Sequence, residues 1–227
     1  MYEISPDYMP HNEHIRTYKW ASERNLFFMA LVLVLTVLVF RRPDAFLNPQ
    51  FHAEEGRNFF ADAYNQGWSS LFNTINGYFH VFPRLILLLA ITFSCPLAFL
   101  PSVFLIVTVT CYLVLVFFIF KRFPGSPWQK FFASLVVFFI PLGNEILMNQ
   151  TNIQWFGALF IFLLFLVRLR SPSSAGTENV GEMGKKIRTY MLLVPLLLFS
   201  LTGPFALLLL PLIVVKYFRT PGSRLPT

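Results

Sequence analysis

Apolar residues occur along this chain in six long runs that are separated by short polar segments. The runs cover residues 26–40, 81–100, 101–120, 131–143, 153–167 and 191–218. Within them, successive positions are apolar without alternation, which favours helices over the strands of a barrel. Only helices and closed barrels satisfy every backbone group inside a bilayer. The pattern therefore predicts an all-α, polytopic membrane protein.

The first and last runs need separate interpretation. About 25 polar residues precede the first run and no small-residue cleavage site follows it, so we expect a retained membrane anchor and not a signal peptide. The last run is too long for one span and is interrupted at 200–204, where Gly203 and Pro204 disfavour a continuous helix. It predicts a short helix, a turn and a second helix.

Composition excludes an ordinary soluble domain. Of the 227 residues, 56% are apolar and 13% are charged, about half the charged fraction of soluble domains. The net charge of +7 is explained by basic residues in cytoplasmic loops, so no nucleic-acid partner is expected. Cys95 and Cys111 lie in apolar runs without metal-ligand spacing, and we expect two buried thiols.

The basic residues indicate which runs cross the membrane. If every run crossed with the N-terminus inside, only three of the 18 Lys and Arg would lie inside. If 81–98 instead stays in the outer leaflet, 14 of the 18 lie inside, as the positive-inside rule requires. This second arrangement predicts about six crossing segments, a cytoplasmic N-terminus, and helices along the outer surface.

This topology divides the chain and places its polar residues. We expect a cytoplasmic segment (1–25), a membrane domain (26–218) and a cytoplasmic tail (219–227). The membrane domain would contain an outer loop at 41–84 and a flexible cytoplasmic linker at 169–189. Most outer acids lie in the outer loop and near residue 145, so the outer face is the expected working face.

Glu54 and Glu55 are the candidate catalytic residues. They come at the start of a predicted surface helix at 53–68, where carboxylates are favoured by the free amide groups of the first turn. They are therefore either ordinary helix-start acids or a general base. Two adjacent carboxylates beside apolar residues disfavour joint ionisation, which would raise one pKa.

Arg84 and His80 are candidate substrate-binding residues. Arg84 stands at the beginning of an apolar segment, where a guanidinium binds phosphate through paired hydrogen bonds. The alternative is an interfacial anchor whose head reaches the headgroup layer. His80 could orient a phosphate or a sugar hydroxyl, although a single His beside aromatic residues is often structural.

A second polar cluster follows the fourth apolar run. Glu145, Asn149 and Trp155 lie within 144–155, at the outer end of that run. A carboxylate, amides and an indole at one depth resemble the lining of a sugar site, or equally a hydrated hairpin. Asn149 also begins an acceptor pattern for N-glycosylation, which we discount because it is short and close to the bilayer.

Other chemistries find no support in the sequence. There is no phosphate-binding glycine loop, metal-ligand cluster, Ser-His-Asp order or basic-aromatic nucleic-acid signature. The predicted spans contain few ionisable residues at mid-membrane, where pumps and transporters place theirs. No cofactor is predicted, and a requirement for a divalent metal is left open.

Taken together, these elements resemble the N-terminal half of the GT-C superfamily of integral membrane glycosyltransferases, over residues 25–220. That superfamily includes lipid A aminoarabinose transferases, protein O-mannosyltransferases and uncharacterised bacterial relatives. The Glu54-Glu55 pair matches the acidic motif of the first outer loop, which holds the family's catalytic carboxylate. The stretch 77–84, with Tyr78, His80 and Arg84, is similar to its second outer loop element. The segments 144–155 and 200–204 look like outer ends of later spans.

The resemblance implies transfer of a sugar from a polyprenyl-phosphate donor to an acceptor on the outer, periplasmic face of a bacterial inner membrane. Glu54 would be the base with Glu55 beside it, and Arg84 would bind the lipid phosphate. Because family members are roughly twice as long, a second membrane subunit supplying further helices is a possible partner. The alternatives are a non-catalytic subunit or scaffold that binds lipid-linked sugar or a protein, and a small transporter or flippase component.

Overall fold

The protein is described by a computed structural model that defines residues 11–139, 146–168, 194–204 and 211. Its helices are α1 (His11–Arg41), α2 (Pro43–Leu47), η1 (Glu55–Phe60), α3 (Ala61–Gln66), η2 (Gly67–Phe72), α4 (Val81–Thr92), η3 (Leu97–Phe99), α5 (Leu100–Arg122), α6 (Pro127–Phe139) and α7 (Ile153–Arg168). Residues 194–202 are also helical. The described ranges contain no strand, only an isolated bridge between Ile75 and Tyr78. An all-α fold is therefore confirmed for them.

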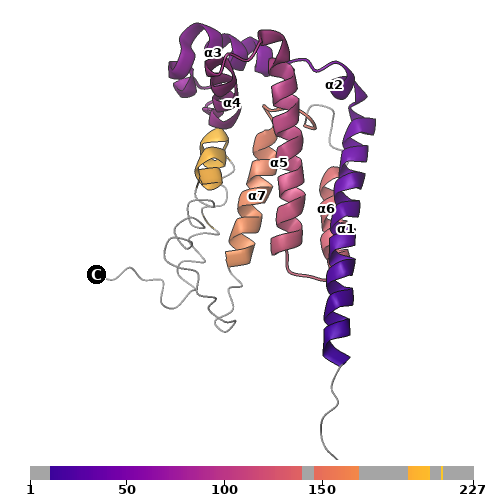
Figure 1. Ribbon diagram of the computed structural model, residues 1–227. Coiled ribbons are helices and arrows are strands. Elements are labelled where there is room, and N and C mark those ends of the chain that lie inside the picture. The colour runs from indigo at the N-terminus through magenta and orange to yellow at the C-terminus, as the bar shows by residue number, and fades with distance from the viewer. Residues whose placement is uncertain (1–10, 140–145, 169–193, 205–210, 212–227) are drawn as a thin grey trace, which may run out of the picture.

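Four helices form a bundle, and the shorter elements gather at one end of it. Helices α1, α5, α6 and α7 run alongside one another (Figure 1). Helices α2, α3 and α4 lie at the end where α1 stops and α5 begins, which we call the capped end (Figure 1). The helix at 194–202, coloured yellow-orange, lies directly below α4 (Figure 1).

The bundle packs through a regular row of α1 side chains. Leu26, Ala30, Val34 and Leu38 recur every fourth residue and are all buried in the main core. This spacing places them on one face of the helix, against α6 and α5. The opposite face is also apolar, and its side chains, such as Val32, are exposed.

Polar contacts fix α1 to α6 at both ends of their contact. At the capped end, Arg41 Nη1 donates a hydrogen bond to the Phe138 carbonyl over 3.0 Å. At the opposite end, Lys130 Nζ lies 2.7 Å from Glu23 Oε1. Helix α6 begins with a capping box, in which Ser126 N donates to Gln129 Oε1 over 2.8 Å. These contacts hold α6 in register beside α1.

The capped end has a smaller apolar core of its own. Phe59 of η1 and Ala63 of α3 pack with Leu87 and Leu88 of α4, and this cluster continues into Phe104 of α5. The surface helix expected at 53–68 is therefore present, but it is divided into η1, α3 and the start of η2. Gly67 adopts a φ of 59°, which ends α3 and turns the chain into η2.

Two helical segments of the described chain are long and apolar enough to cross a membrane, Ser22–Arg41 and Leu97–Arg122. Helix α4 has 12 residues and rises about 18 Å, whereas a hydrocarbon core is about 30 Å thick. The apolar segment Ile153–Leu163 of α7 is likewise short. Six crossing segments and their orientation stay a prediction. The expected boundary at residue 25 lies inside α1, while the linker 169–189 and the tail 219–227 lie outside the described residues.

The opposed ends of α5 give a test of topology. In a Cys95→Ser, Cys111→Ser background, we expect Thr74→Cys at the capped end to react with a membrane-impermeant maleimide in intact cells. Pro124→Cys, in the turn between α5 and α6, should react only after permeabilisation, because α5 separates the two positions. Equal labelling of both cysteines in intact cells would show that α5 does not cross.

Candidate functional site

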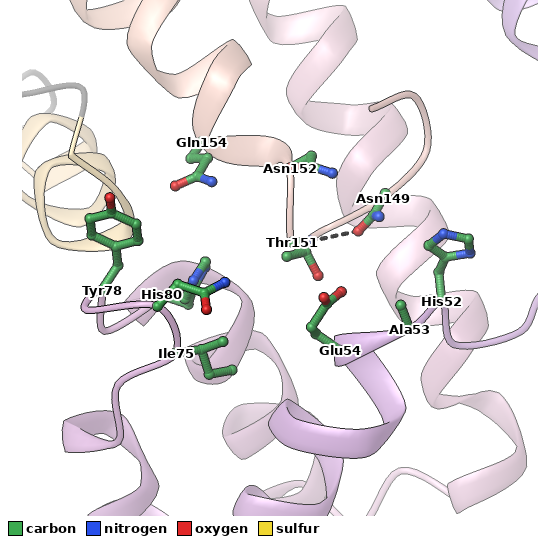
Figure 2. Close-up of a pocket in the computed structure, with 11 residues that line it drawn as sticks. His52, Ala53, Glu54, Ile75, Tyr78, His80, Asn149, Thr151, Asn152 and Gln154 are labelled. Carbon is green, nitrogen blue, oxygen red and sulfur yellow. Dashed lines mark hydrogen bonds between the residues drawn. The ribbon is translucent and has the colours of Figure 1, made fainter. Parts of the chain in front are cut away.

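A polar pocket of about 300 Å³ opens at the capped end, and we call it the Glu54 pocket. Three segments distant in sequence form it (Figure 2). Its lining residues are His52, Ala53, Glu54, Ile75, Asn76, Tyr78, His80, Asn149, Thr151, Asn152 and Gln154. Four of the residues proposed from sequence, Glu54, Tyr78, His80 and Asn149, therefore come together in one cavity.

A tight turn at 52–55 places the side chains of Glu54 and Glu55 on different sides of the chain. The His52 backbone N–H donates to Glu55 Oε2 over 2.9 Å, and the Glu55 N–H donates to the His52 carbonyl over 2.8 Å. This reciprocal pair has the form of the glutamate half of a capping box. Ala53, between them, takes a left-handed φ of 39°. As a result Glu54 lines this pocket, while Glu55 is buried on the other side of the turn.

Glu55 joins the first loop to the loop before α7. Its side chain is only 3% exposed, and its Oε1 accepts a 2.6 Å hydrogen bond from the Gln150 backbone N–H. The Gln150 side chain in turn donates to Thr108 Oγ1 and the Phe104 carbonyl of α5. Both carboxylate oxygens are thus occupied by backbone amides, and this geometry gives Glu55 a structural role.

The raised pKa expected for one acid is found on Glu55. Burial raises the pKa of Glu55 from 4.5 to about 7, against the lowering effect of the two amide hydrogen bonds and Arg42. The neighbouring Glu54 charge also raises this pKa, as the smallest of the five causes. The direction of this pKa shift agrees with the prediction from sequence, but its main cause is desolvation and not the paired charge.

His80 presents an unsatisfied nitrogen at the pocket. It stands at the N-cap of α4 with left-handed φ and ψ of 49° and 45°, and it is only 3% exposed. Phe59 and Tyr78 contact its ring, at centroid distances of 5.3 and 6.2 Å. Burial lowers the pKa of His80 and the Arg84 charge lowers it further, so the ring is neutral at pH 7. Its Nδ1 has no hydrogen-bond partner.

Two further buried atoms at this pocket lack partners. These are Thr151 Oγ1 and Gln154 Oε1. Gln154 packs so closely on Gly203 that a Cβ at position 203 would collide with its side-chain oxygen. Next to this contact, Thr202 Oγ1 accepts a 3.0 Å hydrogen bond from the Phe82 N–H in the first turn of α4. The segment expected to be a half-helix and turn thus packs beside the pocket lining.

Arg84 lies behind the Glu54 pocket and does not line it. Its side chain is 0% exposed, and Nη1 is 2.7 Å from Asp62 Oδ2 while Nε donates to the Phe79 carbonyl. Its guanidinium also stands 5.2 Å from the Phe59 ring centroid. Its Nη2 has no partner. These contacts tie α4 to η1 and α3.

Of the other three predicted binding residues, the structure describes two, which lie in different surroundings. Asn149 is buried, and its side-chain oxygen accepts a 2.8 Å hydrogen bond from the Thr151 N–H (Figure 2). A buried amide is a poor acceptor for N-glycosylation, in keeping with the discounted pattern. Trp155 is exposed and lines neither pocket. Glu145 lies outside the described residues.

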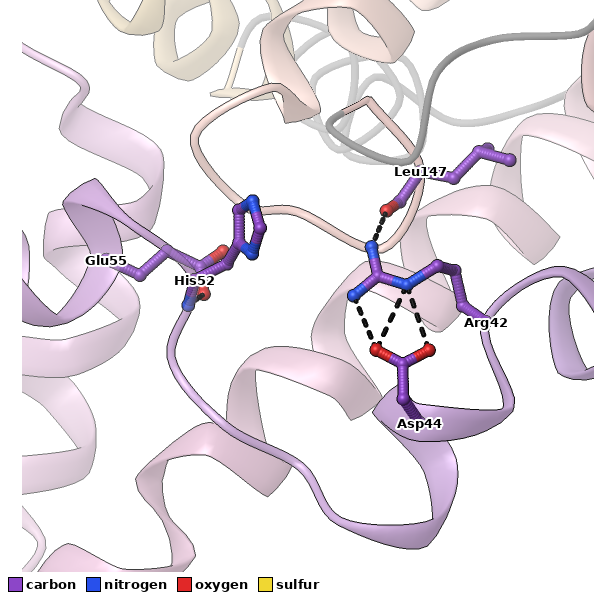
Figure 3. A network of polar contacts seen from close by, with 5 residues as sticks. All are labelled: Arg42, Asp44, His52, Glu55 and Leu147. Atoms are coloured by element: carbon purple, nitrogen blue, oxygen red, sulfur yellow. Dashed lines mark hydrogen bonds and ion pairs between the residues drawn. The ribbon is translucent and has the colours of Figure 1, made fainter.

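A second pocket of about 230 Å³ adjoins the first, and we call it the Arg42 pocket. It is lined by Arg42, Asp44, Ala45, Asn48, Pro49, Gln50, Phe51, His52, Glu55, Pro101, Phe104, Leu105 and Met148. Arg42 donates to the Leu147 carbonyl and pairs with Asp44 at 2.9 Å (Figure 3). The side chain of Asp44 is 67% exposed, and Arg42 lowers its pKa. Because His52 lines both pockets, the 52–55 turn separates them.

Arg42, His52 and Thr151 line the two pockets but were not among the site residues predicted from the sequence. Arg42 had a usable signal, since it directly follows the first apolar run beside Arg41. His52 and Thr151 had none, because their importance depends on two loops that meet only in the folded chain.

We expect the stability of the protein to depend on pH through Glu55. Its folded pKa lies above its unfolded value, so the folded protein holds an extra proton between about pH 4.5 and 7. The free energy of unfolding should therefore decrease as pH rises through that window, by at most about 1.4 kcal/mol per pH unit. Glu55→Gln should abolish this slope. It should also cost about 1–3 kcal/mol, since one backbone N–H then faces an amide NH₂. Thermal unfolding in detergent measures both, with Glu54→Gln as the control that keeps the slope.

The Arg84–Asp62 pair should respond asymmetrically to substitution. Asp62→Asn leaves a fully buried guanidinium without its anion and should cost about 3–5 kcal/mol of unfolding free energy. Arg84→Met keeps an apolar stem and leaves only the part-exposed Asp62 unpaired, so it should cost less. Thermal unfolding of both variants tests this order. A larger loss for Arg84→Met would show that the guanidinium stem or its contact with Phe59 is more important than the charge.

Comparison of the chain with protein-family models, with curated proteins and with solved structures gives no match.

Proposed function

We propose that this protein is a membrane glycosyltransferase of the GT-C type, which moves a sugar from a polyprenyl-phosphate donor to an acceptor. The supporting observation is the pair of adjoining pockets at the capped end, one polar and one with an apolar wall and a guanidinium. Such a pair suits a reaction between a polar sugar and a lipid-linked phosphate. The turn that separates the pockets holds the candidate base.

The membrane location rests on the helices themselves. Two helical segments, Ser22–Arg41 and Leu97–Arg122, are long and apolar enough to span, and their outward faces expose large apolar side chains such as Val32 and Ile106. Exposed apolar faces of this kind are stable in hydrocarbon and costly in water. We propose the six-span topology with a cytoplasmic N-terminus, which places the capped end on the periplasmic side of a bacterial inner membrane.

In this mechanism Glu54 is the general base. Its carboxylate lines the polar pocket, and unlike Glu55 it is not engaged by two backbone amides. Glu54 removes the proton from an acceptor hydroxyl, whose oxygen then bonds to the anomeric carbon. The bond between that carbon and the phosphate oxygen breaks, and its electron pair leaves with the polyprenyl phosphate.

Arg42 is the better candidate for the lipid phosphate within this scheme. It lines the second pocket beside Phe104 and Leu105, which can contact a polyprenyl chain. Its carboxylate partner Asp44 is 67% exposed whereas Arg42 is only 13% exposed, so a phosphate that enters the pocket would compete with Asp44 for the guanidinium. The charge developing on the leaving phosphate would then be stabilised by a guanidinium. Arg84, assigned this role from sequence, is buried against Asp62 and is the second choice.

The same charge pairing favours one alternative, a non-catalytic subunit that binds a lipid-linked sugar or a partner protein. Two of the guanidinium groups near the pockets, those of Arg42 and Arg84, already face a carboxylate, Asp44 and Asp62 respectively. A polar pocket without an available phosphate-binding cation would hold a sugar and leave it unreacted. The two functions differ in whether transfer occurs.

The proposal is tested by following sugar release from a polyprenyl-phosphate donor in proteoliposomes, with candidate partner subunits supplied. Glu54→Gln should reduce transfer about a hundredfold or more, because the base is lost while the shape is kept. Arg42→Ala should weaken donor binding by about 1.5–3 kcal/mol, the value of a hydrogen bond to a charged group. Matched controls are Glu23→Gln, an acid at the opposite end, and Arg57→Ala, an exposed cation near the turn.

Parent-like transfer by Glu54→Gln would remove Glu54 from catalysis. If Arg84→Met lost donor binding while remaining folded, and Arg42→Ala did not, the phosphate would belong to Arg84. Absence of transfer by the parent in every reconstitution, together with retained binding of lipid-linked sugar, would establish the non-catalytic alternative.

A further inference from the structure

We infer that the Glu54 pocket accepts a single sugar unit that is uncharged or carries an amine, and that it rejects sugars bearing a carboxylate. This inference rests on the proposed function and specifies the substrate class of the same site. It follows from the charge, the unsatisfied atoms and the size of the pocket.

The charged groups that line the pocket are of one sign, negative. None of the described residues that line the pocket is Lys or Arg, whereas Glu54 contributes a carboxylate. His80 is neutral at pH 7 because burial and Arg84 lower its pKa. The guanidinium groups of Arg84 and Arg42 do not line the pocket and pair with Asp62 and Asp44. A second carboxylate in this cavity would meet Glu54 without a compensating cation.

The unsatisfied atoms call for a ligand that donates hydrogen bonds. Three residues that line the pocket each have a buried polar atom without a partner: His80 Nδ1, Thr151 Oγ1 and Gln154 Oε1, the last of which also packs against Gly203. The amide oxygen can only accept, an ionised Glu54 can only accept, and the neutral imidazole nitrogen accepts in one of its two tautomers. Hydroxyl and ammonium groups supply the missing donors, and a carboxylate supplies none.

Figure 2 shows how these groups are placed. Glu54 and Thr151 point toward one another from opposite loops, while Gln154 points toward the side of Tyr78. Polar side chains therefore surround the pocket on more than one side, which suits a ring bearing several hydroxyl groups. The volume of about 300 Å³ is at the lower limit for small-molecule sites, so it suits one sugar unit and not a chain.

The test uses the purified full-length protein in detergent and three soluble probes: methyl glucoside, methyl glucosaminide and methyl glucuronide. Ligand-observed NMR titrations measure the dissociation constants. We expect the neutral and amine-bearing probes to bind at least tenfold more tightly than the glucuronide. Glu54→Gln should reduce the ratio between amine and acid to less than threefold, because the difference in charge is removed. Gln154→Ala should weaken all three probes, and Glu23→Gln should match the parent.

The outcomes separate the inference from the function on which it rests. Equal or tighter binding of the glucuronide would overturn the inference, even if sugar transfer were established. An unchanged ratio in Glu54→Gln would also overturn it, since the selectivity would not come from this pocket. The expected order of binding without any transfer would support the inference and contradict the glycosyltransferase function.

Discussion

The capped end depends on one carboxylate, that of Glu55, which holds two chain segments by their backbones. One oxygen accepts from His52 and the other from Gln150, 95 residues away in sequence. Neither bond involves another side chain, so they fix where the main chain runs. The pocket linings before and after these residues, including Glu54 and Asn149, take their positions from this contact. Its cost is the burial of an ionisable group, which is reflected in the raised pKa.

That contact is supported from beneath by α5. Gln150 donates hydrogen bonds to Thr108 and to the carbonyl of Phe104, so the loop before α7 is fixed to α5, a helix that also belongs to the main core. The Met148 N–H donates to the Tyr112 hydroxyl one turn further along the same helix. Both pockets are therefore built on loops whose backbones are tied to a rigid element. This arrangement favours fixed geometry of polar groups over adaptability.

The sequence was most informative where local pattern decides structure. Apolar runs predicted the helices, and Gly203 with Pro204 marked the end of the 194–202 helix, as found. The exclusion of 81–98 from the membrane spans, which rests on the charge asymmetry, stays a prediction. The sequence could not decide between Glu54 and Glu55, because their different exposure depends on Gln150 arriving from a distant loop. The sequence also predicted phosphate binding for Arg84, because its ion-pair partner could not be recognised from local pattern. Its partner Asp62 lies 22 positions earlier, and only the packing of α3 on α4 brings the two charges together.

His52 belongs to the lining of both pockets, so any ligand that moved the 52–55 turn would act on both cavities. A ligand that displaces the 52–55 turn in one cavity changes the affinity of the other cavity. Linkage requires the effect to be equal in both directions. A donor that moved the turn toward a conformation favourable for the acceptor would bind cooperatively with it. A donor that moved the turn the other way would disfavour simultaneous binding of the acceptor. The turn would then determine the order in which the two substrates bind.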